Sequence, residues 1–483
     1  MNIILYVLDS LRADHLSCYG YQRETSPHID QIATDGVLFK NAFSQTTWTR
    51  PSAASILTST YPSVNGLIYR TDSFPSQLTT LPEMLKAEGL LTAGVSTIGN
   101  VSSVLGFAKG FDRFVDLYKR KELYRTRDFI STAKERLTHE DVNQIVLPLA
   151  EDMNVAALSW LEAHRKQDQF LLLWAIDTHD PYNPPPGFDK FCDPHYRGKI
   201  DGSRDSLRHA RSKEDVQRLV DLYDSEIFYN DYCIGQLVDH LKEIDAYEDT
   251  LLILTSDHGE AFHDDHGNVG HGYIPYEELI HVPLIIKFPN SEHRKTRVSQ
   301  LVQLIDLMPT ILEIIGFSGK DKVSPMQGKS ILPTLDGKPI HKYVYSETSP
   351  TEIQDYHRSI RSTHWKYIMT ESSGLRFREA IRNYWKLFSN RAFLRELLIN
   401  PVYYLRKQLG AEPEMLFNLV EDPQEQYNAK DQHPEAAQKC QEALTQWCEK
   451  NKVFSNENGT FSTETSKIDL KTERHLQKLG YID

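Results

Sequence analysis

The chain has 483 residues, of which 40% are hydrophobic and 25% charged, a composition typical of a globular protein rather than a disordered one. Because a single hydrophobic core stops growing near about 250–300 residues, this length predicts one large domain and a smaller one. The net charge of −13, from 54 basic and 67 acidic residues, excludes general nucleic-acid binding, which needs a basic surface.

Apolar runs alternate with helical patterns along the first two thirds of the chain. This alternation predicts an α/β domain built on a doubly wound, mostly parallel sheet with helices on both faces. Ligands in such sheets bind beyond the carboxyl ends of the strands. In chain order, the predicted elements are the strand Ile3–Leu8, the helices Pro27–Asp35, Ser52–Thr58 and Leu81–Glu88, the strand Thr92–Ser96, the helix Asp152–Arg165, the strand Phe170–Ile176, the helix Val216–Ile244, and the strands Leu251–Thr255 and Val282–Phe288.

The pattern changes after about Pro339, where shorter strands and a single helix follow. We therefore expect a large α/β domain over 1–338 and a smaller C-terminal α+β domain over 339–483. Two polar, charged insertions, 118–149 and 187–213, are expected to line or cover the site. The predicted C-terminal elements are the strands Tyr343–Glu347, Ser359–Arg361 and Trp365–Thr370 and the helix Glu435–Lys450.

A basic amphipathic segment over 376–409 reverses the sign of the charge within the C-terminal domain. It carries eight basic residues against two acidic ones, a local net charge of +6. Such a segment can lie on an anionic membrane or bind an acidic partner. Packing of its apolar side against the protein itself is the favoured interpretation, with peripheral membrane contact as the open alternative. Whether the chain forms a homo-oligomer is left open.

The five cysteines are widely spread and contain no Cys-x-x-Cys pair, which predicts reduced thiols rather than a disulfide framework or a zinc knuckle. Met1 is followed almost at once by an apolar strand, without the basic stretch or cleavage site of a secretory leader. No apolar run approaches the roughly 20 residues that a membrane span requires. We therefore expect a cytoplasmic protein.

Polar side chains follow three of the predicted strands, namely Asp9 after the first, 177–179 after the third and 257–258 after the fourth. Taken alone, Asp9 could cap a helix, form an ion pair or bind a cation. An aspartate with a neutral histidine, as in Asp257 and His258, is an ordinary ligand set for Zn²⁺ or Mn²⁺, whereas an all-oxygen set favours Ca²⁺ or Mg²⁺. The pattern therefore indicates a candidate metal site.

Thr49 lies at the expected start of a helix, with Pro51 in its first turn. A helix N-terminus suits an anion, and a hydroxyl held there beside a divalent cation loses its proton more easily and becomes a nucleophile. In isolation, the more frequent role of such a threonine is that of an N-cap.

Several motifs, in family order over nearly the whole chain, resemble those of the sulfatase family of the alkaline phosphatase superfamily. The resemblance rests on the opening segment Val7–Asp14 with Cys18–Gly20, on Thr49–Ala53 at the family's Cys/Ser-x-Pro-Ser-Arg signature, on Trp174–Tyr182 at its His-x-Pro loop, on Ser256–Glu260 as its Ser-Asp-His-Gly-Glu motif, and on Leu416–Asn428 and Leu479–Tyr481 at the C-terminal end.

The resemblance implies an alkaline phosphatase-like fold and one divalent metal ion, Mn²⁺, Zn²⁺, Ca²⁺ or Mg²⁺. It implies metal ligation by Asp9, Thr49, Asp257 and His258, with Ser10 as a weaker candidate, catalytic roles for Thr49, His179 and His271, and substrate binding by His179, His271 and Asn100. A second metal ion at His263 and His266 is disfavoured, because the companion Asp-x-x-x-His pattern of two-metal relatives is missing.

The departures from the family pattern bear on the substrate. Sulfatases convert the Cys or Ser of the signature to formylglycine, but this chain has Thr49 there and Ala53 at the position of the signature Arg. The usual Lys-Trp-His is replaced by Ile98-Gly99-Asn100, and a downstream Lys by His271. Threonine with a downstream His-Gly is similar to phosphoethanolamine and phosphoglycerol transferases and to phosphodiesterase-like relatives, which use threonine to attack phosphorus.

We therefore expect a metal-dependent hydrolase that cleaves a phosphate ester (a phosphodiester, a phosphomonoester or a phosphonate) with Thr49 as the nucleophile. The substrate would be an anionic small-molecule, lipid or glycan ester. The alternatives are a sulfatase that works without formylglycine, a phospho-group transferase, and a catalytically inactive binding protein.

Overall fold

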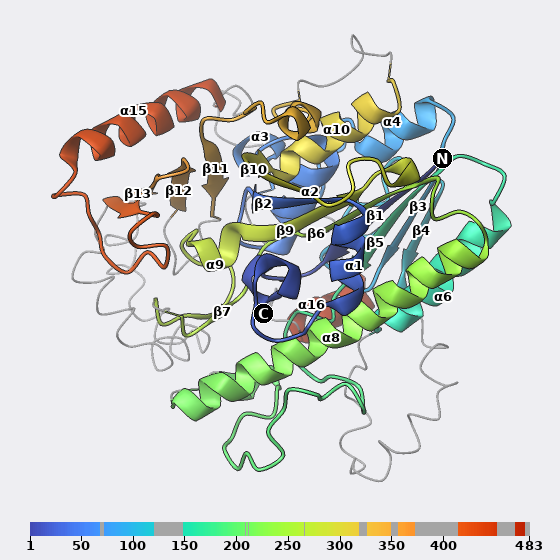
Figure 1. Cartoon of the computed structure of the whole chain (residues 1–483), viewed down its shortest axis with the longest axis horizontal. Helices are drawn as coiled ribbons and strands as arrows, with labels where there is room; N and C mark the ends of the chain where they lie inside the picture. The colour runs from blue at the N-terminus through green and yellow to red at the C-terminus, as the bar shows by residue number, and fades with distance from the viewer. Residues whose placement is uncertain are drawn as a thin grey trace.

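A computed structural model describes residues 1–67, 72–119, 148–207, 209–210, 212–264, 266–317, 326–348, 356–371, 414–451 and 469–478. One large sheet crosses the molecule with helices on either side, and a smaller sheet stands at one end (Figure 1). Among the described helices, none has both the length and the apolar character that crossing a bilayer requires. The basic segment 376–409 and the closing 479–481 lie outside the described residues, so what was inferred from them stays a prediction.

The large sheet has eight strands in the order β10-β2-β9-β6-β1-β5-β3-β4. All neighbouring pairs are parallel except those of β9, which runs antiparallel to β2 and to β6. The predicted doubly wound, mostly parallel α/β sheet is therefore confirmed. The strands are β1 (Asn2–Leu8), β2 (Val37–Phe43), β3 (Leu91–Ser96), β4 (Arg113–Asp116), β5 (Gln169–Ala175), β6 (Thr250–Ser256), β9 (His281–Lys287) and β10 (Thr296–Gln303).

Alternate residues of β1 face two separate apolar layers, because successive side chains of a strand point to opposite faces. Ile3, Leu5 and Val7 pack in one core cluster with residues of α2, α4 and α10. Ile4, Tyr6 and Leu8 pack in the other with residues of α1, α6 and α8. These helices are α1 (Pro27–Asp35), α2 (Thr49–Thr58), α4 (Leu81–Ala87), α6 (Ala150–Ala163), α8 (Lys213–Glu243) and α10 (Leu307–Ile314).

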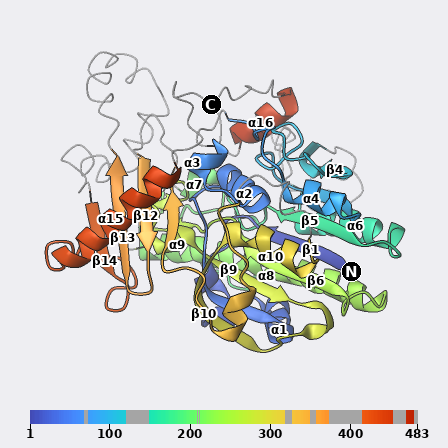
Figure 2. The ribbon, with the colours of Figure 1, turned by 90° about the horizontal axis from the view of Figure 1, so that it is seen from above.

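The smaller sheet is antiparallel, with four strands in the order β11-β12-β13-β14. The helix α15 packs against it and stands apart from the large sheet in Figure 2. This arrangement confirms the C-terminal α+β class, while the boundary at residue 338 stays a prediction. The elements are β11 (Val344–Glu347), β12 (Tyr356–Arg361), β13 (Trp365–Glu371), β14 (Glu414–Asn418) and α15 (Pro434–Asn451).

A last helix, α16 (Leu470–Lys478), leaves the small sheet and packs back on the large domain beside the 3-10 turn η3 (Leu117–Lys119). Tyr118 and Thr472 share a hydrogen bond of 3.0 Å between their hydroxyls, and Leu476 is fully buried in the core cluster of α2 and α4. The C-terminal end of the described chain thus takes part in the α/β domain. The short elements are α3 (Pro62–Asn65), α7 (Arg204–Leu207), α9 (Glu277–Ile280), β7 (Ala261–Phe262) and β8 (Val269–Gly270).

Candidate functional site

Two buried aspartates meet at the carboxyl ends of β1 and β6. The register pairs Leu8 with Ser256, so the residues that follow, Asp9 and Asp257, leave the sheet at the same edge, and both are fully buried. Asp9 Oδ2 accepts a hydrogen bond of 3.1 Å from Trp174 Nε1. Parallel pairing of strands thus brings together two carboxylates that lie far apart in the sequence.

Ser10 fixes the mutual orientation of these carboxylates. Its hydroxyl donates to Asp9 Oδ1 at 3.1 Å, and its backbone N–H donates to Asp257 Oδ1 at 3.0 Å. The backbone of Ser10 adopts a left-handed conformation, with φ of 62°. Such a conformation is uncommon outside glycine and tends to persist where the surroundings demand it. Ser10 therefore orients both carboxylates, whether or not it also binds the cation directly.

His258 presents an unprotonated nitrogen to the aspartates. Its Nδ1 donates to the carbonyl of Gly259 at 2.8 Å, so Nε2 carries the lone pair of the neutral ring. Burial lowers the pKa of His258 to about 4, so the ring is neutral at physiological pH. Nε2 lies 3.4 Å from Asp257 Oδ2 and 4.0 Å from Asp9 Oδ1.

Thr49 is the first residue of α2, and Trp48, which caps that helix, makes no side-chain capping bond. The alternative in which Thr49 is the N-cap is therefore wrong. Its Oγ1 lies 3.3 Å from His258 Nε2, and the side chain is fully buried. The structure thus places a hydroxyl at the positive end of a helix and beside the Asp-His cluster.

The residues present fit a divalent cation. Donor atoms of Asp9, Asp257 and His258 lie within 4.8 Å of one another, as expected for ligands 2.0–2.4 Å from a shared ion. Asp257 Oδ2 is buried and has no hydrogen-bond partner in the part of the chain that the structure describes. Burial raises the pKa of Asp9 to about 6 and that of Asp257 to about 7. A cation would stabilise both charges.

The predicted substrate contacts His179 and His271 lie beside this cluster. The ring centroid of His271 lies 4.9 Å from that of His179 and 4.5 Å from that of His258. His179 Nδ1 faces the carbonyl of Asp180 at 2.5 Å, and His271 Nδ1 lies 3.2 Å from Glu260 Oε1. Both rings are thus oriented through their Nδ1 atoms, beside the Asp-His cluster.

Asn100 is buried close to the head of α2, held by a neighbour of Thr49. Arg50 donates from one guanidinium nitrogen to Asn100 Oδ1 at 3.0 Å and from another to the carbonyl of Asp72 at 2.9 Å. A guanidinium can only donate, so the amide oxygen must face it and Nδ2 must point away. Asn100 Nδ2 is buried without a partner among the described residues.

His266 is not placed as a metal ligand. Its Nδ1 lies 2.7 Å from Glu278 Oε1 and its Nε2 lies 3.1 Å from the carbonyl of Glu425, so both ring nitrogens are engaged elsewhere. The Asp9-Asp257-His258 cluster is the one group of such side chains that the described residues bring together. The number of metal ions stays a prediction.

Three residues of this region were not predicted from the sequence. Trp174 opens the motif Trp174–Tyr182, but an indole within a buried strand is typical of the core and does not indicate a hydrogen bond to Asp9. Arg50 gave no signal beyond its place next to Thr49. His475, on α16, is 2% exposed and lies against Gly99, 376 positions away in the chain, a proximity that only the tertiary fold creates.

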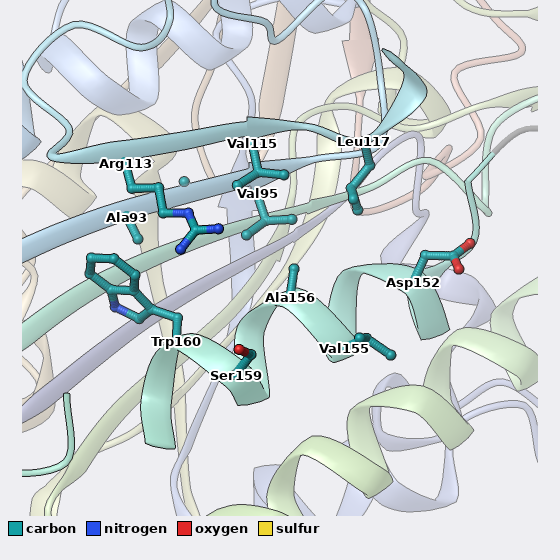
Figure 3. A pocket seen from close by; sticks show the side chains of 11 residues that line it. Ala93, Val95, Arg113, Val115, Leu117, Asp152, Val155, Ala156, Ser159 and Trp160 are labelled. Carbon is teal, nitrogen blue, oxygen red and sulfur yellow. The ribbon is translucent and has the colours of Figure 1, made fainter. Parts of the chain in front are cut away.

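A small cavity lies elsewhere, between the β3–β4 edge of the sheet and α6 (Figure 3). Its volume is about 150 Å³, and its lining combines Val95 and Val115 with Trp160 and the guanidinium of Arg113. It contains neither a histidine nor a nucleophile of the cluster described above. We therefore do not associate it with the chemistry.

Sequence comparison gives a consistent set of relatives. The family described as Sulfatase matches residues 1–317, and the one described as N-sulphoglucosamine sulphohydrolase, C-terminal, matches residues 265–388. The chain is 24% identical over 515 residues to the N-acetylglucosamine-6-O-sulfatase of Bacteroides thetaiotaomicron, covering 89% of this chain and 87% of that protein. It is also 24% identical to human iduronate 2-sulfatase, over 70% and 68% of the two chains.

Solved structures show the same fold. A protein in complex with its substrate D-glucosamine-2-N,6-O-disulfate superposes with a TM-score of 0.70 at 18% identity, covering 94% of this chain and 98% of the other. The phosphonate monoester hydrolase of Agrobacterium radiobacter superposes with a TM-score of 0.68 at 17% identity, covering 95% and 98%.

Proposed function

The chain belongs to the sulfatase family, a family of ester hydrolases, and from that premise we propose that it cleaves a phosphate ester with Thr49 as the nucleophile. The observation that carries the proposal is the position of Thr49 Oγ1, 3.3 Å from His258 Nε2 at the head of α2. Asp9, Asp257 and His258 would hold one divalent cation together with Thr49.

Each group of the site has a separate role in the proposed reaction. A cation bound here would act as a Lewis acid that lowers the pKa of the Thr49 hydroxyl and neutralises one substrate oxygen. The N-terminus of α2 favours the negative charge that Thr49 Oγ1 develops. His179 and His271 donate to the other oxygens of the substrate, and Asn100 adds an uncharged donor.

The reaction takes place in two displacements at phosphorus. Thr49 Oγ1 gives its proton to solvent water and attacks phosphorus, and the bond to the leaving oxygen breaks. The departing alkoxide takes up a proton, for which His271 is the proposed donor, and His271 regains a proton from solvent. Water then attacks the phosphothreonine, the bond between phosphorus and Thr49 Oγ1 breaks, and the threonine regains its proton. One water is consumed, and one alcohol and one phosphate product are released.

The identity of residue 49 favours phosphorus over sulfur. A formylglycine hydrate can expel sulfate by collapse of a hemiacetal, but the threonine side chain cannot form that aldehyde. A threonine ester must instead be opened by water at the central atom, which phosphorus chemistry accommodates well. Two structural neighbours, the phosphonate monoester hydrolases of Agrobacterium radiobacter and Silicibacter pomeroyi, share the fold.

Sulfate-ester hydrolysis is the second candidate, and the sequence relatives favour it. Those named above are an N-acetylglucosamine-6-O-sulfatase and an iduronate 2-sulfatase, so a sulfated glycan is the corresponding substrate class. The distinction is measurable as kcat/KM on matched aryl phosphodiesters, phosphonates and sulfates in the presence of Mn²⁺, Zn²⁺, Ca²⁺ or Mg²⁺. A clear preference for the sulfate would reverse our ranking.

The nucleophile is tested by two substitutions at one position. Thr49→Ala should lower kcat by several orders of magnitude, whereas Thr49→Ser keeps a hydroxyl and should retain measurable turnover. Mass spectrometry of acid-quenched wild-type protein should detect a phosphoryl adduct on Thr49. Turnover of Thr49→Ala equal to wild type would leave direct attack by water as the mechanism and refute the proposal.

A further inference from the structure

Helix α16 brings a histidine from the C-terminal end of the described chain to the edge of the site. A Cβ built on Gly99 would lie 2.7 Å from His475 Cδ2 and 3.5 Å from its Nε2, so only a glycine at 99 leaves room for the ring. The ring also stacks on Tyr118, with centroids 4.5 Å apart and planes at 25°. His475 is therefore held between η3 and the loop that carries Asn100.

The docking of α16 is specific rather than incidental. Lys119 Nζ lies 3.2 Å from Asp469 Oδ2 at the start of the helix, and Thr472 shares a 3.0 Å hydrogen bond with the hydroxyl of Tyr118. Leu476, the next residue after His475, is fully buried in the core cluster that contains Ile98. These contacts fix both the rotation and the depth of the helix, and with them the direction of the histidine.

Two polar atoms in this corner are buried and have no partner among the described residues, His475 Nε2 and Asn100 Nδ2. A buried polar atom without a hydrogen bond costs about 1–3 kcal/mol, and such atoms are rare in native proteins. Both atoms belong to residues beside Gly99, because Asn100 follows it in the chain and His475 lies against it. Since Arg50 holds the amide oxygen of Asn100, the donor edge is the one left open.

We propose that His475 is a substrate-binding residue, whose Nε2–H, together with Asn100 Nδ2, donates to an oxygen of the tetrahedral anion that the site receives. This inference rests on the proposed function for the nature of the anion. The corner around Gly99 is the place where the sequence lacks the Lys-Trp-His of the family pattern, and His475 supplies a ring nitrogen to it from the other end of the chain.

The charge state of the ring suits this role. Burial, with a smaller contribution from the nearby charge of His179, lowers the pKa of His475 to about 3. The ring is therefore neutral over the working range of pH, and one of its nitrogens carries a hydrogen to donate. A neutral donor binds an anionic oxygen without adding another positive charge to those expected at the metal site.

The test measures binding of inorganic phosphate and inorganic sulfate to the metal-loaded protein by isothermal titration calorimetry. His475→Phe keeps an aromatic ring against Tyr118 but removes the donor, and it should weaken binding at least tenfold. His475→Gln restores a side-chain N–H and should recover part of the loss. Thr472→Val is the matched control, because it loosens the docking of α16 but removes no donor to the anion, and it should weaken binding less than His475→Phe does.

Calorimetry of anion binding needs no attack by Thr49, so the two proposals fail separately. Wild-type affinity in His475→Phe would overturn the role of His475 and leave the nucleophile intact. Equal weakening in His475→Phe and Thr472→Val would also overturn it, since docking alone would then explain the effect. Absence of phosphate and sulfate binding by the wild type would do the same. Thermal melting of each variant, with bound metal quantified, establishes that the fold and the cation site are retained.

Discussion

At the scale of single residues, the two buried carboxylates at the ends of β1 and β6 dominate the energetics of the site. Both are deprived of water, and burial raises the pKa of each. The charge of Asp257 raises the pKa of Asp9 further. The sequence indicated Asp9, Asp257 and His258 as neighbours because each follows a strand of a parallel sheet. It could not indicate Ser10 and Trp174 as their hydrogen-bond partners, since serine and tryptophan after or within apolar strands have no pattern of their own.

The pKa of Asp257 predicts how the metal-free protein responds to pH. Its ordinary value of 3.8 rises to about 7 in the folded state, so the folded protein binds a proton that the unfolded chain has lost. Between these values, the stability of the metal-free protein falls as pH rises, by about 1.4 kcal/mol per pH unit for this group. Asp257→Asn removes the contribution. Thermal melts in chelator should show that the stability of the variant rises relative to that of the wild type from pH 4 to pH 7. In a separate titration, added metal should no longer stabilise the variant.

Parallel pH profiles of the two proteins would contradict this assignment, because the difference between them isolates one carboxyl group. A wild type that gains no stability from Mn²⁺, Zn²⁺, Ca²⁺ or Mg²⁺ at pH 7 would contradict the cation site itself. Ligand binding to the folded state raises stability in proportion to the logarithm of the ligand concentration, so the metal titration is a sensitive readout.

Trp174 offers a second test at this scale. Its indole N–H is the donor that holds Asp9 Oδ2 at 3.1 Å. Trp174→Phe keeps an aromatic ring in the core but frees that oxygen, and outer hydrogen bonds of this kind change metal affinity by about 10–100-fold. We expect a loss of affinity in this range, measured by competition with a metal-binding dye. Trp160→Phe, in α6 and remote from the cluster, is the control that should leave the affinity unchanged. Equal affinity in Trp174→Phe would show that Asp9 is oriented by Ser10 alone.

At the scale of elements, the central strands were predictable and the outer ones were not. The strands β1, β5 and β6 are buried along their lengths and read as continuous apolar runs. The strand β10 mixes exposed and buried residues at one edge of the sheet, and β4 is a short strand at the other edge, so neither gave a clear apolar run. The direction of β9 was not predictable either, because an apolar run is the same in a parallel and an antiparallel pair.

Two glycines test how tightly the elements fix the site. A Cβ on Gly259 would lie 2.0 Å from the carbonyl of Glu278 in α9, and a Cβ on Gly36 would lie 2.3 Å from the carbonyl of Ile286 in β9. In both cases a backbone carbonyl would have to move, so each alanine variant should lose about 1–3 kcal/mol of stability in urea denaturation. Only Gly259 adjoins a predicted ligand, His258. Gly259→Ala should therefore also weaken metal binding, and Gly36→Ala should not. Equal metal affinity in both would mean that the loop after β6 moves without carrying His258.

At the scale of the whole molecule, a buried cluster of charges joins the small sheet to the large domain. Lys366 of β13 is fully buried, with its Nζ 2.9 Å from Glu425 Oε1 and 3.3 Å from Glu277 Oε1 of α9. Arg361 of β12 reaches the same Glu277 at 3.2 Å. Charged residues were visible in the sequence, but their meeting was not, since the partners come from three separate stretches of the chain.

Lys366→Met tests whether this cluster unites the two sheets. The change keeps an unbranched side chain of similar length but leaves Glu425 buried without its cation, and loss of one partner of such a pair costs about 3–5 kcal/mol. Burial already raises the pKa of Glu425 to about 7 with the lysine in place. Without it, the pKa rises further, so the deficit should be smallest below pH 7 and grow as pH rises above it, where only the wild type ionises Glu425. Lys366→Met/Glu425→Gln removes both charges and should recover part of the stability.

Hydrogen exchange shows whether the charge cluster stabilises the small sheet alone or the whole molecule. If the cluster holds the small sheet on the large domain, amides of β12, β13 and β14 should exchange faster in Lys366→Met, while those of β1, β5 and β6 keep wild-type protection. The double variant should restore slow exchange in the small sheet. Uniform acceleration over both sheets would mean that the molecule unfolds as one unit and that the cluster stabilises it globally. Unchanged exchange everywhere would mean that apolar contacts, such as those between Tyr61 and the stacked pair of Tyr345 and Trp447, join the two parts without help from the charges.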